Sequence, residues 1–133
     1  MELTGITPAR IAAEGVPLAA AIARLDRFAD GAKLWSWGKD ELNLMAIGCW
    51  VAGIVPAIPP ARFENACKLC LAAGMPYEDL QRTRSSDLAR FFGVETDAAQ
   101  AHDGLADARS VALALQTLLR DGRLTPDDFH RVR

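Results

Sequence analysis

The pattern of hydrophobic residues predicts a chain built mostly of helices, with very few strands. Apolar residues recur every three or four positions, as on the buried face of a helix, in residues 16–29, 41–52, 61–73 and 104–120. Lys33–Trp37 is short, aromatic and followed by glycine, which is typical of a strand, and Ile54–Val55 is a weaker candidate for an edge strand. Because a single strand cannot form a stable sheet, the fold is either essentially helical or lacks the other strands of its sheet.

The sequence also predicts which elements are buried, which residues cap helices and which segments are irregular. The apolar residues of segment 41–52 fall on nearly every side of the expected helix, so we expect it to be buried between two layers. Asp40 is suited to cap its N-terminus. Tyr77–Arg84 is polar and is expected to be irregular, whereas residues 85–92 are expected to form a short helix and Thr125 to cap a final turn.

The size and charge of the chain limit its class. A length of 133 residues is most simply one domain, 1–133, large enough for a hydrophobic core. The formal net charge of −2 argues against a strong, sequence-independent grip on duplex phosphates, which requires many cations on one face. It does not argue against a site in which carboxylates hold metal ions.

The sequence predicts no membrane span and no signal peptide, and we expect a cytoplasmic location. Gly48, Gly53 and Pro56 interrupt the longest apolar stretch, and the N-terminal residues lack the basic and apolar regions of a signal peptide. The three cysteines are expected to be reduced. Cys67 and Cys70 form half of a zinc site or a redox pair, but no second pair of ligands accompanies them, so we interpret both as core residues.

Segment Ala101–Ala108 places a histidine and an aspartate five residues apart at the start of the last long helix. His102 titrates near neutrality, as a general base requires. Asp107 lies one turn into the helix, on the flank of its apolar stripe, and is expected to be half-buried. Burial of a lone carboxylate is costly unless a cation or hydrogen-bond donors compensate it. Asp107 is therefore either a metal ligand or the ion-pair partner of Arg109, Arg90 or another cation.

A second acidic position follows the expected strand. The chain runs from the strand through a Trp37-Gly38 turn to Asp40 and Glu41 at the start of the next helix. The spacing from Gly38 selects Glu41 as the functional acid, whereas the residue type selects Asp40. We leave the two alternatives open.

These residues resemble the motifs of a known enzyme family. His102 and Asp107, within Ala-His-Asp-Gly-Leu-Ala-Asp-Ala-Arg, resemble the third motif, His-x4-Asp, of the DEDDh-type 3′–5′ exonucleases. The Trp-Gly turn followed by an acid is similar to the second motif of one branch of that family. Segments Leu3–Thr7 and Leu88–Val94 look like family segments near these motifs, so the resemblance covers most of the chain in the right order.

The resemblance implies an α/β fold of the RNase H-like type, incomplete at its N-terminus and therefore helix-rich, with one to three short strands. It implies a metal-dependent exonuclease that acts on the 3′ ends of single-stranded RNA or DNA. His102 would be the catalytic base. Asp107, with Asp40 or Glu41, would bind Mg²⁺ or Mn²⁺, of which the family uses two ions.

Two kinds of side chain are candidates for contact with single-stranded nucleic acid. Trp37 and Trp35 alternate onto one face of the strand, where they either stack on a base or pack in the core. Arg84, with Arg82 and Arg90, would steer phosphate toward the site, unless these arginines form only a solvated face.

The chain departs from the family in its first motif, because no Asp-x-Glu occurs anywhere in the sequence. The visible acids would hold one ion weakly, so we expect little or no activity from this chain alone. Three explanations stay open. The recorded start omits the first strands; a homodimer or strand exchange along an open sheet edge supplies them; or the chain is a non-catalytic helical module that binds nucleic acid or protein.

Overall fold

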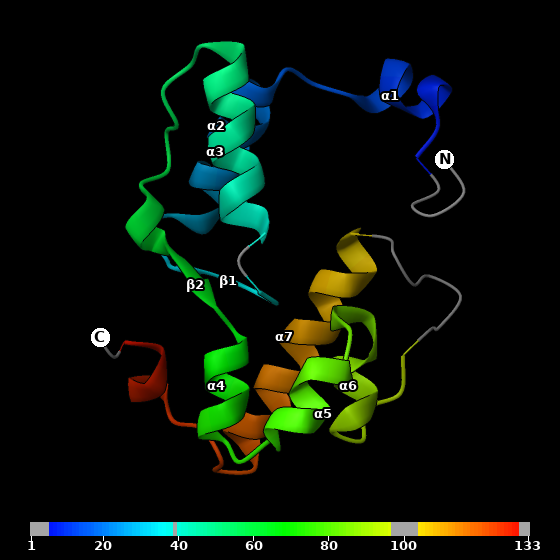
Figure 1. Ribbon diagram of the computed structural model, residues 1–133, viewed down its shortest axis with the longest axis vertical. Coiled ribbons are helices and arrows are strands. Elements are labelled where there is room, and N and C mark those ends of the chain that lie inside the picture. The colour runs from blue at the N-terminus through cyan, green and yellow to red at the C-terminus, as the bar shows by residue number, and fades with distance from the viewer. Residues whose placement is uncertain (1–5, 39, 97–103, 131–133) are drawn as a thin grey trace. The chain divides into compact units, whose positions relative to one another are not determined.

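The computed structural model, which describes residues 6–38, 40–96 and 104–130, is helix-rich with one short, two-stranded parallel sheet (Figure 1). This architecture is consistent with the expected α/β class. The chain divides into two compact units, Met1–Glu64 and Asn65–Arg133. The expectation of a single domain stays a prediction. None of the helices within the described ranges has the length and hydropathy needed to cross a membrane.

The first unit is organised around a crossover between its two strands. The strands pair directly, and the helix α3 connects them, as a parallel pair requires. Next to the paired strands, the Lys33 ammonium lies 3.7 Å from the Glu64 carboxylate. The elements in chain order are α1 (Pro8–Glu14), α2 (Leu18–Ala29), β1 (Leu34–Ser36), α3 (Asp40–Ala52), the 3₁₀ turn η1 (Pro60–Arg62) and β2 (Phe63–Asn65), which lies at the boundary with the second unit.

The core of the first unit is small. Ile22 of α2, Cys49 of α3 and Ile58 are its buried residues, and partly buried hydrophobic residues pack against them, namely Leu34, Met45, Ile54 and Phe63. Gly48 allows α2 to approach α3 closely, because a Cβ at this position would lie only 3.1 Å from the Leu18 side chain.

Arg62 ties the η1 turn to α2. Its guanidinium forms an ion pair with Asp26 at 2.6 Å and donates a hydrogen bond to the Ala32 carbonyl at 3.2 Å. Arg62 is more than four-fifths buried, with a side-chain exposure of 18%, so this pair is better shielded from water than an ordinary surface ion pair.

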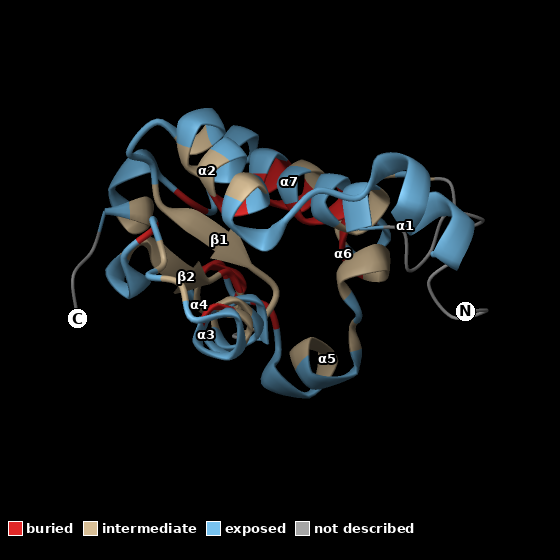
Figure 2. Cartoon of the chain, turned by 90° about the horizontal axis from the view of Figure 1, so that it is seen from above, coloured by how far each residue is buried: buried red, intermediate tan, exposed pale blue. Residues whose placement is uncertain are grey.

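The expectation that the helix over 41–52 is buried between two layers is wrong. Cys49 is the only residue of α3 that is fully buried, and Leu44, Ile47, Trp50 and Val51 are exposed, as the pale blue of α3 shows in Figure 2. The packing residues of α3 lie on one side only. The helix also begins at Asp40, so this residue belongs to the first turn and is not the N-cap.

Two predictions for the middle of the chain are also wrong. The helix expected over 61–73 is divided into η1, β2 and the short helix α4, because Phe63 packs in the first core beside the paired strands and this tertiary contact overrides the helical periodicity. The Asn65 side chain then accepts a hydrogen bond from the Cys67 amide and starts α4. Ile54–Val55 forms no strand, because Gly53, at φ +69°, ends α3 and Ile54 turns into the core.

The second unit is a helical cluster around α7. This helix packs one face against η2 and α6, and its buried residues include Val111, Ala114, Leu115 and Leu118. A buried hydrogen bond of 3.0 Å from the Ala89 amide to the Ser110 hydroxyl joins α6 to α7. The elements are α4 (Cys67–Ala72), α5 (Tyr77–Arg82), η2 (Ser85–Asp87), α6 (Leu88–Phe91), α7 (Gly104–Arg120) and η4 (Pro126–Phe129).

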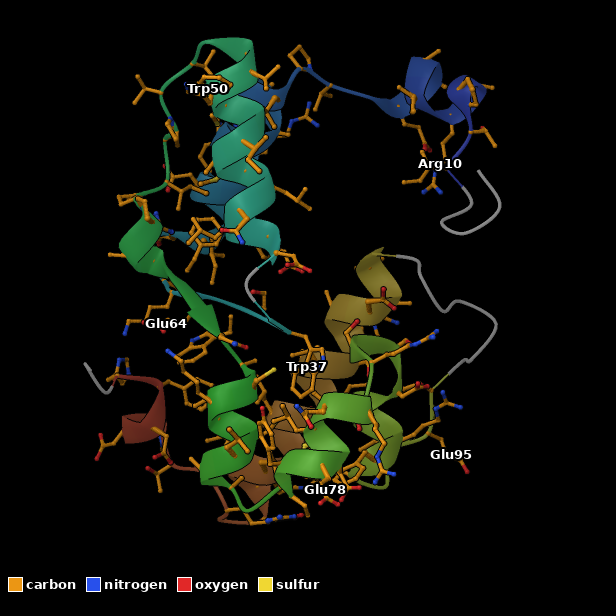
Figure 3. The ribbon with its side chains drawn as sticks, viewed as in Figure 1. Arg10, Trp37, Trp50, Glu64, Glu78 and Glu95 are labelled. Carbon is orange, nitrogen blue, oxygen red and sulfur yellow. The ribbon has the colours of Figure 1, made fainter. Side chains whose placement is uncertain are left out.

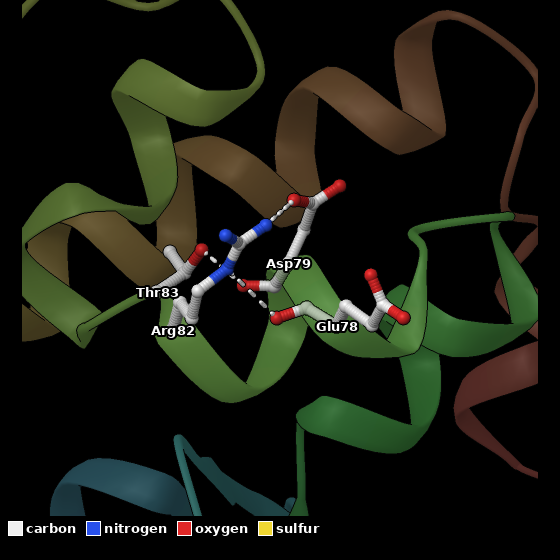
Figure 4. A network of polar contacts seen from close by, with 4 residues as sticks. All are labelled: Glu78, Asp79, Arg82 and Thr83. Carbon is white, nitrogen blue, oxygen red and sulfur yellow. Dashed lines mark hydrogen bonds and ion pairs between the residues drawn. The ribbon is translucent and has the colours of Figure 1, made fainter.

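The polar segment 77–84, expected to be irregular, contains the helix α5. Its acidic residues lie in the first turn and Arg82 in the last, which suits the helix dipole. Figure 4 shows how Arg82 pairs with Asp79 at 2.9 Å and donates to the Glu78 carbonyl, while the Thr83 hydroxyl donates to the Asp79 carbonyl. Local polar contacts therefore stabilise a helix that has no clear apolar stripe.

Arg123 anchors the end of the second unit. It follows α7, and its guanidinium donates two hydrogen bonds, of 3.1 and 2.9 Å, to the Ala73 carbonyl at the end of α4. The same guanidinium carbon lies 5.6 Å from the centre of the Phe92 ring. One side chain thus connects three segments of this unit.

We expect Arg123→Ala to lower the free energy of unfolding of the second unit by about 1–2 kcal/mol, because two charge-assisted hydrogen bonds and a cation–π contact are lost. Urea denaturation followed by far-UV circular dichroism measures the change. Arg120→Ala is the matched control, because Arg120 is 70% exposed and its ion pair with Asp121 is long, at 4.0 Å, and therefore weak. Equal losses in the two variants would contradict the anchoring role.

Candidate functional site

Asp107 occupies the position that the sequence predicted, in the first turn of α7. Its side chain is half-buried, and the oxygen Oδ1 is buried with no hydrogen-bond partner among the described residues. A buried carboxylate oxygen without a donor is rare, because its desolvation is not compensated. This unpartnered oxygen is the feature of the second unit that most resembles one ligand of a cation site.

The alternative role for Asp107, an ion pair with arginine, is not seen among the described residues. Arg90 instead pairs with Asp87 in the adjacent 3₁₀ turn, and no ion pair joins Arg109 to Asp107. The nearby hydroxyl of Ser110, one turn along α7, accepts its hydrogen bond from the Ala89 amide. The structure therefore offers Asp107 no described cationic partner.

His102, the expected base, lies outside the described residues, so its role and its distance from Asp107 stay predictions. The helix that follows it does begin at Gly104 and ends at Arg120, which are the expected bounds. The local framework of the His-x4-Asp segment is thus confirmed only from Gly104 onward.

Asp40 and Glu41 are both exposed and both lie in the first turn of α3, within the first unit. A carboxylate in this position is stabilised by the positive end of the helix dipole. Asp107 belongs to the second unit, and the structure describes the units separately, so the joint site of these acids stays a prediction. In the described ranges, no three His, Cys, Asp or Glu side chains gather closely enough to hold a metal ion.

The two candidate nucleic-acid contacts differ in their surroundings. Trp37 follows β1 and is half-buried, as is Trp35. Arg84 is exposed and precedes η2. Of the three neighbouring arginines, Arg82 and Arg90 form ion pairs with acids of their own helical turns, whereas no ion pair joins Arg84 to a described residue. Arg84 is the arginine of this group most able to meet a phosphate.

Of the two cysteines predicted to be core residues, only Cys70 is fully buried. Cys67 begins α4 and is half-buried, Cys70 is fully buried, and no disulfide joins any of the three cysteines. The pKa of Cys70 is raised from 9.0 to about 12, chiefly by burial and also by the neighbouring Cys67, while the positive charge of Arg123 opposes the shift. A thiol with this pKa is neutral at physiological pH and is a poor nucleophile and metal ligand.

Ser110 is the residue of this region that the sequence analysis missed. It is 1% exposed and connects α7 to α6. The available signal was its spacing, because Ser110 lies three residues after Asp107 and four before Ala114, on the apolar stripe of α7.

Comparison of the chain with protein-family models, with curated proteins and with solved structures finds no match.

The pKa of Cys70 predicts a pH dependence of stability. In the unfolded chain this thiol ionises near its ordinary pKa of 9.0, whereas in the folded chain it keeps its proton to about pH 12. The unfolded state therefore loses this proton first, so the contribution of Cys70 to stability is constant below about pH 9 and falls as the pH rises toward 12. We expect the urea midpoint to drop more between pH 8 and pH 10 in the wild type than in Cys70→Ala. An identical drop would contradict the assignment.

Proposed function

We propose that the chain supplies part of the active site of a metal-dependent 3′–5′ exonuclease of the DEDDh type, which acts on single-stranded RNA or DNA ends. The observation that carries the proposal is the buried, unpartnered Oδ1 of Asp107. It lies where the His-x4-Asp motif requires a metal ligand. The order of strand, turn and helix around Asp40 supports the second motif, and the RNase H-like fold is part of the same proposal.

The chemistry of each residue follows from its position. Asp107 offers one carboxylate oxygen to a cation, and Asp40 or Glu41 offers a second. His102 would accept the proton of the attacking water. A bound Mg²⁺ or Mn²⁺ would lower the pKa of that water and neutralise charge on the phosphate. Asp107 fits this demand, since no described residue donates a hydrogen bond to its oxygen Oδ1.

Two side chains are proposed to contact the substrate. Arg84 would attract a phosphate of the strand, because it is exposed and is not paired with any described acid. Trp37 would stack on a base with the part of its ring that is exposed. Neither contact distinguishes RNA from DNA, so the proposed substrate is a single strand of either kind.

Full activity requires carboxylates that this sequence does not contain. Two-metal hydrolysis needs two ions about 4 Å apart and enough acids to hold both. The chain has no Asp-x-Glu, and its described residues include no cluster of three ligands. We therefore propose weak metal binding and slow turnover for the 133 residues alone.

A second candidate function is a non-catalytic module that binds another macromolecule. The exposed apolar side of α3 favours it, because large hydrophobic side chains on a helix surface commonly mark an interaction site. This candidate predicts binding without cleavage.

Metal binding tests the role of Asp107 directly. We expect the wild-type chain to bind Mn²⁺ weakly and Asp107→Asn to bind it about tenfold or more weakly still, because the substitution removes one anionic ligand. Electron paramagnetic resonance of unbound Mn²⁺ measures the affinity. Asp121→Asn is the control, since Asp121 is 54% exposed just beyond the other end of α7. Equal Mn²⁺ affinity in the wild type and Asp107→Asn would refute the ligand role.

Cleavage tests the proposed reaction. On a 5′-labelled single-stranded oligonucleotide with Mn²⁺, we expect slow shortening from the 3′ end. His102→Ala should slow it by about 100-fold or more, because the general base is lost, and Asp107→Asn should abolish it. Gel electrophoresis of a time course gives the rates. Rapid cleavage that both variants retain would show that another site, or a contaminant, performs the hydrolysis.

A further inference from the structure

The helix α3 carries an apolar surface that the first unit leaves uncovered. Leu44, Ile47, Trp50 and Val51 are 69%, 60%, 84% and 74% exposed. We call these four residues the α3 outer face. Trp50 lies near the C-terminal end of the helix (Figure 3). Exposure of this much apolar area on neighbouring turns of one helix is unusual for a protein that remains a monomer.

The opposite side of α3 is already used within the unit. Met45 and Cys49 contact the core, and Gly48 lies against Leu18 of α2. The side chains of the α3 outer face are therefore not needed to complete this core. A rotation of the helix to bury it would expose Cys49, which is now 1% exposed.

The chemistry of the surface defines its partner. No charged residue occurs between Glu41 and Arg62, so the α3 outer face has no cation to bind phosphate and no acid to bind a basic peptide. In the sequence, Lys39 precedes the helix and the next basic residue is Arg62, so α3 lacks the cluster of lysines and arginines by which helices bind anionic lipid surfaces. The complementary surface is itself apolar and uncharged.

The spacing of the residues in the α3 outer face suits packing against a second helix with the same spacing of apolar residues. Leu44, Ile47 and Val51 are separated by three and then four residues, which is the seam by which two helices pack together. A second copy of the chain presents this same seam. In a two-fold arrangement, each residue of the seam meets the seam of the other copy without any need for a separate complementary surface.

We propose that the chain forms a symmetric homodimer through the α3 outer face. The four residues of this face present on the order of 600 Å² of exposed area, close to the roughly 600 Å² that each partner buries at the lower limit of a specific interface. The available area is thus sufficient for a specific dimer. This inference does not depend on the proposed nuclease function.

Analytical ultracentrifugation of the full chain tests the proposal. We expect a discrete species of twice the 14.4 kDa chain mass at micromolar concentrations, in reversible equilibrium with the monomer. The emission of Trp50, 84% exposed in the single chain, should shift to shorter wavelength as the concentration rises, and Trp50→Phe should lack that shift.

A matched pair of substitutions locates the interface. Leu44→Glu places one charge from each copy in the dimer contact and should raise the dissociation constant by about 100-fold or more. Leu105→Glu is the control, because Leu105 is 70% exposed, as Leu44 is at 69%, but belongs to α7. It should leave the dimer unchanged. Circular dichroism confirms that both variants are folded.

Three results would overturn the proposal. A monomer at all concentrations would mean that the α3 outer face is covered by other parts of the chain or by a different partner. A dimer that Leu44→Glu leaves intact would place the interface elsewhere. Open-ended aggregation, or equal weakening by Leu105→Glu, would show that association is not specific to α3.

Discussion

The second unit depends on the hydrogen bond from the Ala89 amide to the Ser110 hydroxyl. Both residues are almost fully buried, and the bond links positions 21 residues apart at 3.0 Å. Without it, a backbone N–H group would be buried and unpaired, which costs about 1–3 kcal/mol. The bond therefore fixes the rotation of α7 about its axis. The same rotation brings Leu118 into the core and leaves Asp107, three residues before Ser110, at the edge of the buried face. The half-buried carboxylate is a consequence of how α7 packs.

The two units use their long helices differently. In the second unit, α7 buries a stripe of side chains that includes Val111, Leu115 and Leu118, although Leu105 and Leu119 of the same helix are exposed. In the first, α3 is apolar on nearly every side, but the small core around Ile22 and Cys49 covers only one of them. The remaining apolar area gains free energy only by association, since hydrophobic stabilisation follows the area removed from water. The helix with the most hydrophobic sequence is thus better suited to an interface than to a core.

The elements that the sequence predicted correctly are those determined by residues close together in the chain. Three such elements depend on residues close to one another in the chain: α7, the helix predicted over 16–29 and observed over 18–29, and the final turn, where Thr125 and Asp128 form a capping box. Pairing of β2 with β1 depends on residues about 30 positions apart, so Phe63 was assigned to a helix. Periodicity also shows which side chains of α3 are apolar but not what covers them. At the candidate site, spacing predicted that Asp107 would be half-buried, whereas its lack of a hydrogen-bond partner depends on where the side chains of α6 and η2 lie.

The charges of the chain agree with the proposed order of events at the site. With 17 acidic and 15 basic residues, the protein as a whole does not attract a polyanion. Two arginines of the second unit are also neutralised locally, Arg82 by Asp79 and Arg90 by Asp87. In the proposed function, a phosphate would therefore meet repulsion from Asp107 until a cation occupies the free oxygen. Metal binding would precede the binding of the strand. Arg84, which forms no ion pair with a described residue, would then orient the strand more than it strengthens binding.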